Sequence, residues 1–184
     1  EDFQKRGFGD EKFNEEMNIL EGGALFSYAM TLFDAKKYEE AAAEFIKFVN
    51  KKPKHEYADK ALQNAAYAFE MSRRYESAAT VYERIFKEYP KSSFADEALF
   101  KVAFNQENGF KFEEAINNYL MLVEKYPESK NRAPALFNAA NALENLQRYE
   151  EAARQYLRFA EMFPNHEKAP YAFYKSIIVY EKAK

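Results

Sequence analysis

The sequence contains no cysteine and no tryptophan, and it has only five glycines, six prolines and two histidines among its 184 residues. Without cysteine the chain can form neither a disulfide framework nor a thiolate metal site, and it lacks a cysteine nucleophile. The shortage of helix breakers, beside frequent Ala, Glu, Lys and Leu, favours an all-helical chain. No apolar run approaches the roughly 18 residues that a membrane span requires, so we expect no direct membrane span.

An excess of charge of one sign is also lacking. The formal net charge is -3, from 27 basic and 30 acidic residues, and residues 1–21 hold three of the basic and seven of the acidic ones. The remaining chain is nearly neutral, with both signs interspersed. A nucleic-acid-binding surface would show clustered Lys and Arg, so we expect no nucleic-acid partner. With 47% apolar residues, the chain can bury a core as one continuous structure.

The sequence is rich in internal repetition. Four prolines recur at a constant spacing of 37 residues, at Pro53, Pro90, Pro127 and Pro164. The same spacing relates three further series, namely Tyr38, Tyr75, Phe112 and Tyr149; Ala41, Ala78, Ala115 and Ala152; and Leu25, Leu62, Leu99 and Leu136. A fixed period of this length is typical of a solenoid of stacked repeats.

Each repeat contains two helical stripes. The first has the i, i+3, i+4, i+7 spacing of one helix face, at Leu62, Ala65, Ala66 and Phe69. The second has intervals of four, three and four, at Ala78, Tyr82, Ile85 and Tyr89. A short polar corner separates the stripes, and the proline ends the second helix because its ring clashes with the preceding turn. The repeat is therefore predicted to be a helix-turn-helix.

This unit resembles the tetratricopeptide repeat family. The shared features are a small residue on the first helix, as at Ala66, Ala103 and Ala140, an alanine followed by an aromatic residue on the second helix, and the terminal proline. The unit is longer than the family's usual length of about 34 residues, and we place the additional residues after the proline. Leucine also stands where the family has a first-helix tryptophan. The resemblance covers about residues 22–184.

The resemblance implies an all-α fold, a right-handed α-solenoid of antiparallel helix pairs that forms a superhelix. The expected units are four repeats and a half repeat, at 22–58, 59–95, 96–132, 133–169 and 170–184. Residues 1–21 break the period, because Glu16 stands where a proline is expected. We expect a capping helix or a tail there, and Gly22-Gly23 weakens its continuation into the first repeat.

The amino-acid sequences of the linkers indicate which branch of the family the chain resembles. The segments 88–99 and 125–129, which contain Tyr89-Pro90-Lys91-Ser92 and Tyr126-Pro127-Glu128-Ser129, are similar to the bacterial envelope branch of the family. That branch includes the outer-membrane-assembly lipoprotein of the β-barrel machinery and the periplasmic coordinator associated with the Tol-Pal system. The similarity implies a periplasmic or outer-membrane-associated location in a Gram-negative bacterium. A cytoplasmic location is the alternative.

No constellation of residues in the sequence indicates catalysis. His55 and His166 occupy the same linker position of different repeats, so we interpret them as exposed loop residues rather than metal ligands. The acidic pairs Glu39-Glu40, Glu113-Glu114 and Glu150-Glu151 begin second helices, where negative charge stabilises the helix dipole by roughly 0.3 to 1 kcal/mol each. We therefore expect no enzyme activity, no cofactor and no metal site.

In the tetratricopeptide repeat family the first helices form the inner, concave wall, which holds the ligand. Mapped onto this sequence, that wall is aromatic with interspersed amides: Phe26, Met30, Phe33, Gln63, Asn64, Tyr67, Phe100, Lys101, Phe104, Phe137, Asn138, Asn141 and Tyr174. These side chains either thicken the packing between repeats or form a groove for an apolar peptide or amphipathic helix. A chaperone-tail carboxylate clamp is disfavoured, because Phe26, Met30 and Phe100 stand where its polar groups are expected.

We therefore expect a non-enzymatic protein-protein interaction scaffold that binds a partner segment in a concave groove, within a bacterial envelope assembly or cell-division complex. One alternative is a cytoplasmic adaptor of the same family. Another is a structural assembly subunit that contacts itself or a partner through its C-terminal helix. The last rests on Tyr174, Ile177, Ile178 and Tyr180, which are more apolar than the cap of a solenoid usually is. Such a helix requires either further chain or a contact that covers it.

Overall fold

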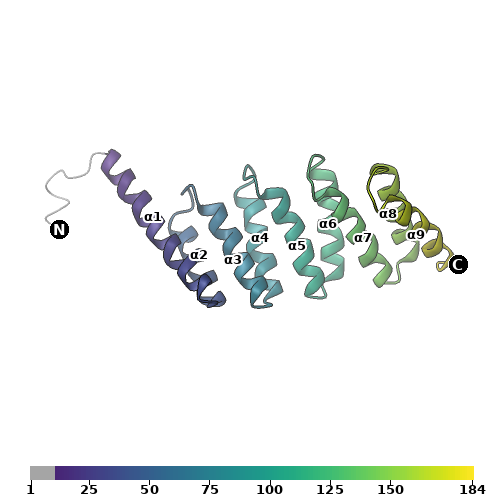
Figure 1. Ribbon diagram of the computed structural model, residues 1–184, viewed down its shortest axis with the longest axis horizontal. Coiled ribbons are helices and arrows are strands. Elements are labelled where there is room, and N and C mark those ends of the chain that lie inside the picture. The colour runs from purple at the N-terminus through teal and green to yellow at the C-terminus, as the bar shows by residue number, and fades with distance from the viewer. Residues whose placement is uncertain (1–10) are drawn as a thin grey trace. The chain divides into compact units, whose positions relative to one another are not determined.

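The computed structural model describes residues 11–184, and within that range the chain forms nine α-helices and no strand (Figure 1). The helices are α1 (Glu11–Asp34), α2 (Tyr38–Lys51), α3 (Ala58–Met71), α4 (Tyr75–Glu88), α5 (Ala95–Asn108), α6 (Phe112–Lys125), α7 (Arg132–Asn145), α8 (Tyr149–Met162) and α9 (Ala169–Glu181). They belong to two compact units, Glu1–Arg74 and Tyr75–Lys184. Inside each unit consecutive helices pack against each other. The all-α prediction is confirmed.

Unit 1 begins with a long helix. α1 runs without a break for 24 residues, so the boundary expected after residue 21 falls inside a continuous helix. Gly22-Gly23 does not interrupt it, and residues 11–21, for which we predicted a capping helix or a tail, are the first part of α1. Residues 1–10, where a tail was the other possibility, lie outside the described residues.

Gly22 allows close packing between α1 and the linker that follows α2. A Cβ atom at Gly22 would lie 2.3 Å from Nε2 of His55, so the missing side chain makes room for the imidazole. The His55 ring also packs on Phe48, with ring centroids 5.1 Å apart. This packing offsets part of the cost of about 1 kcal/mol that glycine carries inside a helix.

The residues that recur every 37 positions form the core of both units. In unit 1, Ala41, Phe45 and Leu62 are fully buried. In unit 2, the matching alanines of the second helices are Ala78, Ala115 and Ala152, and all three have no exposed surface. Their small side chains let the paired helices approach closely, and neighbouring tyrosines and phenylalanines fill the wider gaps.

The corners between paired helices share one backbone conformation. Each contains a residue other than glycine in the left-handed region, with φ of 61° at Lys36, 58° at Arg73, 61° at Phe110 and 60° at Gln147. These positions are again 37 residues apart. A side chain costs roughly 1 to 2 kcal/mol in this region, so the packing of the two helices holds the corner in shape.

One side chain at the same place in each linker closes a small turn by accepting the backbone N–H two residues ahead. The four bonds join His55 Nδ1 to Tyr57 (3.2 Å), Ser92 Oγ to Phe94 (3.1 Å), Ser129 Oγ to Asn131 (3.0 Å) and His166 Nδ1 to Lys168 (3.1 Å). Both histidines are half-buried, and their rings pack on Phe48 and Phe159. The expectation that they are exposed loop residues is therefore wrong, because each ring serves as a turn acceptor and a packing element.

Ion pairs connect the corner before a second helix with the second helix one repeat earlier. The basic residue just before a second helix pairs with an acidic residue in the first turn of the second helix one repeat earlier, as in Arg74–Glu39 (3.3 Å), Lys111–Glu76 and Arg148–Glu113 (2.6 Å). The glutamates that begin these helices thus have a second role beside the helix dipole. Because the pairs are exposed, each contributes less than about 1 kcal/mol.

Candidate functional site

In unit 1, the expected wall residues of α1 pack largely against the rest of the unit. The Phe26 ring lies 5.3 Å from that of Phe45 and 6.2 Å from that of Phe48, centroid to centroid. It also contacts Tyr57 at 5.6 Å. Phe26 is half-buried, so most of its ring serves the contact between α1, α2 and the next linker.

The remaining wall residues of unit 1 contact each other between α1 and α3. The Phe33 ring stacks on Tyr67 with centroids 5.7 Å apart and an interplanar angle of 27°. The Asn64 amide lies 3.4 Å from the Met30 sulfur and donates a hydrogen bond to it. Gln63 is half-buried, whereas Tyr67 is 46% exposed. Tyr67 is therefore the ring that this part of the wall offers to a ligand.

In unit 2, two of the predicted phenylalanines serve the packing. Phe137 on α7 is only 9% exposed, with its ring 5.7 Å from that of Tyr156 and 5.4 Å from that of Phe159. The Lys168 ammonium lies 4.9 Å above the same ring. Phe100 on α5 is half-buried and lies 5.6 Å from the Tyr119 ring. For these two side chains the structure favours the packing interpretation over an open groove.

Two other aromatic residues of the predicted wall are exposed in unit 2. Phe104 on α5 is 40% exposed, and Tyr174 on α9 is 60% exposed. The Lys101 ammonium lies 5.6 Å from the centroid of the Phe104 ring, a cation–π contact on the same helix. An apolar side chain of a ligand could pack on either ring.

The amides of the predicted wall belong to a hydrogen-bond pattern that repeats. Tyr119 on α6 donates from its hydroxyl to Glu107 at 2.9 Å, and Tyr156 on α8 donates to Glu144 at 3.0 Å. Each pair also meets the next first helix. Asn138 donates to the Tyr119 hydroxyl oxygen at 3.3 Å, and Lys175, 37 residues later, approaches Glu144 at 2.8 Å.

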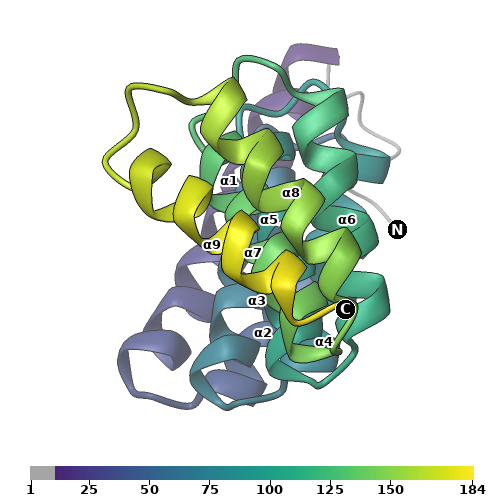
Figure 2. The same cartoon turned by 90° about the vertical axis from the view of Figure 1, so that its right-hand side faces the viewer.

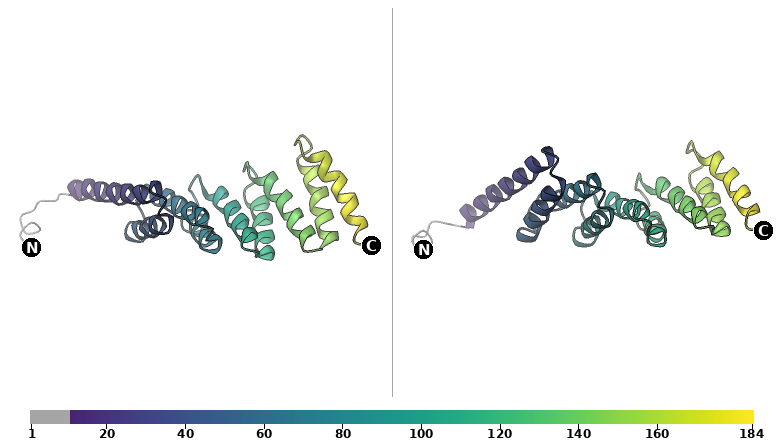
Figure 3. Two further views of the ribbon diagram at one scale, coloured as in Figure 1. Left: turned by 60° about the horizontal axis from the view of Figure 1, so that its bottom comes forward. Right: turned by 90° about the horizontal axis from the view of Figure 1, so that it is seen from below.

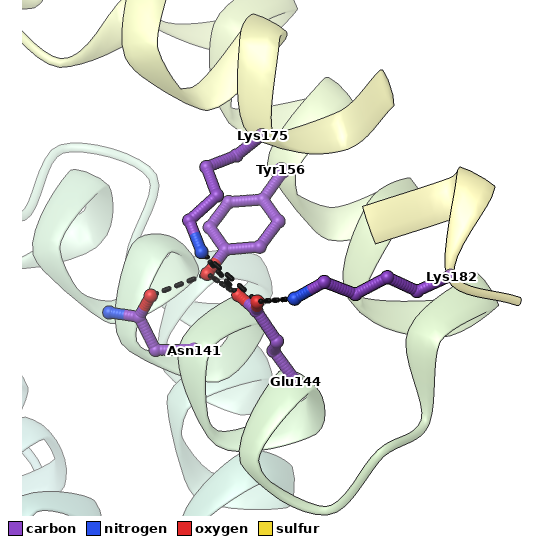
Figure 4. Close-up of polar contacts among 5 residues, drawn as sticks. All are labelled: Asn141, Glu144, Tyr156, Lys175 and Lys182. Atoms are coloured by element: carbon purple, nitrogen blue, oxygen red, sulfur yellow. Dashed lines mark hydrogen bonds and ion pairs between the residues drawn. The ribbon is translucent and has the colours of Figure 1, made fainter. Parts of the chain in front are cut away.

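Glu144 is the centre of a polar cluster of five side chains (Figure 4). Its carboxylate accepts from Lys175, from Lys182 at 3.2 Å and from the Tyr156 hydroxyl. That hydroxyl also lies 2.5 Å from Asn141 Oδ1, so two acceptors share its one hydrogen. Three side chains, from α8, α9 and the C-cap of α9, thus converge on one carboxylate.

The electrostatics keep this cluster in one protonation state. Burial alone would raise the pKa of Glu144, but hydrogen bonds from Lys175, Tyr156 and Lys182 outweigh it and hold the pKa below its ordinary value. Burial, followed by the interaction with Glu144, raises the pKa of Tyr156. Burial and the Glu107 charge raise the pKa of Tyr119 in the same way. Near neutral pH the Glu144 carboxylate is charged and both hydroxyls remain donors.

A hollow of about 570 Å³ lies next to this cluster in unit 2. Polar side chains of α5, α7, α8 and α9 and of the α7–α8 corner line it: Glu107, Asn141, Glu144, Asn145, Gln147, Tyr149, Lys175 and Lys182. Asn141 is the member of this set that we predicted as a wall residue. The 37-residue step relates two of the others to residues of the preceding repeat, Glu144 to Glu107 and Lys175 to Asn138, but it does not show that these side chains converge.

The hollow presents hydrogen-bond donors and acceptors that could pair with a polar ligand. Its side chains carry charges of both signs, and the amides of Asn141 and Asn145 can each donate and accept. Among residues 11–184, no group of three or more His, Asp or Glu side chains is arranged to hold a metal ion. No helix in that range is long and apolar enough to cross a membrane.

The fold is similar to several solved structures. TPR-like repeats described as belonging to a kinesin light chain of Podosopora anserina share 13% identity and a TM-score of 0.60, over 87% of this chain and 85% of that one. BtubC from P. vanneervenii shares 15% identity and a TM-score of 0.62, over 91% and 84%. YrrB, a TPR protein with an unusual peptide-binding site, shares 18% identity and a TM-score of 0.55, over 86% and 82%. These likenesses show the fold and confirm the expected solenoid class.

A family model adds sequence evidence. The model described as Tetratricopeptide repeat matches residues 60–92, 97–129 and 134–166, which together make up more than half of the chain. Each matched segment begins one residue inside an expected repeat and ends two residues after its proline. Comparison with curated protein sequences finds no match. The chain belongs to the tetratricopeptide repeat family.

Proposed function

We propose that this protein is a non-enzymatic scaffold that binds an extended segment of a partner protein on the first helices of unit 2. The observation that carries the proposal is the combination of an exposed aromatic ring and a polar hollow in equivalent positions. Phe104 holds on α5 the place that Asn141 holds on α7, one repeat apart. Asn141 lines the hollow, and Phe104 is exposed.

The chemistry of the surface indicates the class of ligand. Amide groups such as Asn141 and Asn145 pair with the backbone N–H and C=O groups of an extended peptide, and an exposed ring accepts an apolar side chain. Glu107 and Glu144 are balanced by Lys175 and Lys182 in the lining of the hollow. A strongly acidic or strongly basic ligand would gain little there. The fold shared with YrrB, whose title names a peptide-binding site, supports a peptide as the ligand.

The test uses peptides selected on the wild-type chain from a random peptide library. Their dissociation constants are then measured by fluorescence anisotropy on Phe104→Ala and Asn141→Ala. We expect binding to weaken at least about tenfold in each variant, which corresponds to about 1.4 kcal/mol. Phe110→Ala is the matched control, because Phe110 is the same residue type and is 82% exposed in a corner. Selected peptides that bind Phe104→Ala as tightly as wild type would refute the proposal.

We further propose that the partner belongs to a bacterial envelope assembly or cell-division complex, with this protein periplasmic or outer-membrane-associated. The wording of the linkers at residues 88–99 and 125–129 supports this placement. A cytoplasmic adaptor is the alternative. Fusions of the native gene product to alkaline phosphatase and to a fluorescent reporter that folds only in the cytoplasm separate the two. An inactive phosphatase beside a fluorescent reporter would overturn the envelope placement.

A further inference from the structure

Two first helices of unit 2, α5 and α7, carry a glutamate at equivalent positions. Figure 2 looks along this unit with α9 and α8 in front and α7, α6 and α5 behind them, and both views of Figure 3 show these helices following one another in chain order. Glu107 on α5 and Glu144 on α7 are 37 residues apart, and both line the hollow. Each accepts a hydrogen bond from a tyrosine of the next helix, Tyr119 or Tyr156. The two carboxylates therefore have the same surroundings in successive repeats, except for their basic neighbours.

The basic neighbours are present at one carboxylate only. Glu144 bonds two ammonium groups, from Lys175 at 2.8 Å and from Lys182 at 3.2 Å. Moving back 37 residues from these lysines gives Asn138 and Asn145. Both equivalent positions one repeat earlier thus hold a neutral amide, so the repeat provides no cation for the carboxylate on α5.

Glu107 is bonded through one of its two oxygens. Oε2 accepts from the Tyr119 hydroxyl at 2.9 Å. Asn138 donates to that hydroxyl oxygen at 3.3 Å rather than to the carboxylate. Among the side chains that the structure describes, no Lys or Arg forms an ion pair with Glu107, and none donates to Oε1. A half-buried acidic group thus lines the hollow without a basic partner from the described part of the chain.

The charge of the hollow is therefore balanced in total but not in place. Its lining contains two acidic and two basic residues, yet both lysines bond Glu144. One cation from a ligand would complete an ion pair at Glu107, whereas further cations would meet Lys175 and Lys182. The lining therefore favours a segment with one basic residue over a strongly basic segment.

An exposed aromatic ring lies one helical turn before Glu107. Phe104 precedes it by three residues on α5, so the two side chains are neighbours on the helix surface, and Phe104 is 40% exposed. Long basic side chains lay their carbon stem on apolar surface while the charged group reaches a polar partner. Lys101 lies a further turn back, with its ammonium 5.6 Å from the ring centroid. A ligand cation is therefore favoured at the Glu107 end of the ring and disfavoured at the Lys101 end.

We propose that Glu107 binds the charged group of one lysine or arginine side chain in the partner segment, with the carbon stem of that side chain packed on Phe104. This inference rests on the proposed peptide binding and names the residue that sets its specificity. It assigns Glu107 the ligand's cation in place of the two lysines that Glu144 receives from the chain itself.

The first test reads the sequences of the peptides that are selected on the wild-type chain. We expect Lys or Arg to be enriched at one position, and we expect this enrichment to disappear in a selection on Glu107→Gln. The amide keeps an acceptor for the Tyr119 hydroxyl and removes the charge. Peptides selected on wild type without an enriched basic position would overturn the proposal.

The second test measures how one selected peptide uses its charge. The peptide is synthesised with lysine at the enriched position and with an acetylated N-terminus, so that no terminal ammonium competes. In its analogue norleucine replaces the lysine, which keeps the carbon stem and removes the ammonium. On wild type the analogue should bind about fivefold more weakly by fluorescence anisotropy, as a partly shielded ion pair implies. This preference for lysine should disappear on Glu107→Gln. Damage to the fold would weaken both peptides alike, so a preference that persists would overturn the proposal.

Asn138→Lys tests the same contact from inside the chain. The substitution copies the relation of Lys175 to Glu144 onto Glu107, so an internal ammonium competes with that of the ligand. We expect the preference for lysine to disappear in this variant too. Glu83→Gln is the control, because Glu83 lies on α4, outside the lining of the hollow, with 44% of its side-chain surface exposed. It should keep the full preference, and its loss there would contradict the assignment to Glu107.

The outcomes separate this proposal from the peptide binding on which it rests. If binding weakens in Phe104→Ala while Glu107→Gln keeps the preference for lysine, the role of Glu107 is refuted and the proposed peptide binding stands. If the library yields no peptide that binds the wild-type chain, both proposals are refuted.

Discussion

Lys175 on α9 reaches back to Glu144 on α7, with the ammonium nitrogen 2.8 Å from the carboxylate. Lys182, the C-cap residue about two turns further along, approaches the same carboxylate at 3.2 Å. Glu144 is largely shielded from solvent, with 16% of its side-chain surface exposed. The Glu144 carboxylate thus connects two positions of the last helix with the repeat before it.

Replacement of this carboxylate by an amide should loosen α9. Glu144→Gln removes the charge from hydrogen bonds that involve two ammonium groups, and charged hydrogen bonds contribute more than neutral ones. We expect the free energy of unfolding to fall by about 1 to 2 kcal/mol, measured by urea denaturation. Glu150→Gln is the control, because its side chain is 67% exposed, and it should change stability by less than about 0.5 kcal/mol.

The same variant should show a distinct pH dependence. Because the folded-state pKa of Glu144 lies below its ordinary value, its stabilisation is complete above the unfolded pKa of about 4.3. It is lost as the pH falls through the lower folded-state pKa. The stability gap between wild type and Glu144→Gln should therefore be constant near neutral pH and narrow below about pH 4. A gap that widens in acid would contradict the assignment of a charged carboxylate.

Replacement of two neighbouring glycines in α1 by alanine should change the free energy of unfolding in opposite directions. Gly22→Ala places a Cβ atom 2.3 Å from the His55 ring, so we expect a loss of about 1 to 3 kcal/mol from overpacking. Gly23→Ala meets nothing within 4 Å and should gain about 0.5 to 1 kcal/mol from helix propensity. Hydrogen exchange of the α1 and α2 amides measures both. Equal effects of the two substitutions would show that the His55 contact is absent in solution.

The corner before α8 should become more stable with glycine. Gln147 has φ of 60°, where a Cβ atom is unfavourable, so Gln147→Gly relieves strain but adds freedom to the unfolded chain. We expect a net gain of about 0.5 to 1 kcal/mol in thermal unfolding. Arg154→Gly, at an exposed position inside α8, should instead lose about 1 kcal/mol. A loss in both variants would indicate that the corner does not keep this conformation in solution.

Alanine substitutions of two phenylalanines of the predicted wall should distinguish a side chain that packs in the core from one that is available to a ligand. Phe137 is 9% exposed and Phe104 is 40% exposed. Phe137→Ala should cost about 3 to 5 kcal/mol, because it leaves a cavity under Tyr156 and Phe159. Phe104→Ala should cost less than about 1 kcal/mol. Urea denaturation gives both values, and similar losses would mean that Phe104 also belongs to the core.

The sequence alone predicts the core well because the residues that recur every 37 positions are the ones that pack between helices. Ala78, Ala115 and Ala152 are all fully buried, as a repeating close approach of helices requires. The sequence left the continuity of α1 open because Gly22 and Gly23 disfavour a helix locally, while the contact of Gly22 with His55 is a tertiary one. Local propensity is informative only until such packing overrides it.

The wall was harder to predict than the core. The family pattern places Phe104 and Phe137 on the concave wall that the first helices form. In the structure Phe104 is exposed, whereas Phe137 lies under Tyr156 and Phe159. The identity of a residue does not show which way a large ring turns between two helices. The cluster around Glu144 depends on lysines of the following helix, and only the three-dimensional structure shows that they converge.

The shared backbone of the four corners has a practical meaning for engineering. Lys, Arg, Phe and Gln all adopt the same left-handed φ there, so helix packing imposes the corner and its side chain is free to vary. Phe110 projects from such a corner with 82% of its surface exposed. A cysteine placed at this position would be the only thiol in the chain. It would provide a single attachment point for a fluorophore or a surface tether, remote from the packing that defines the repeat.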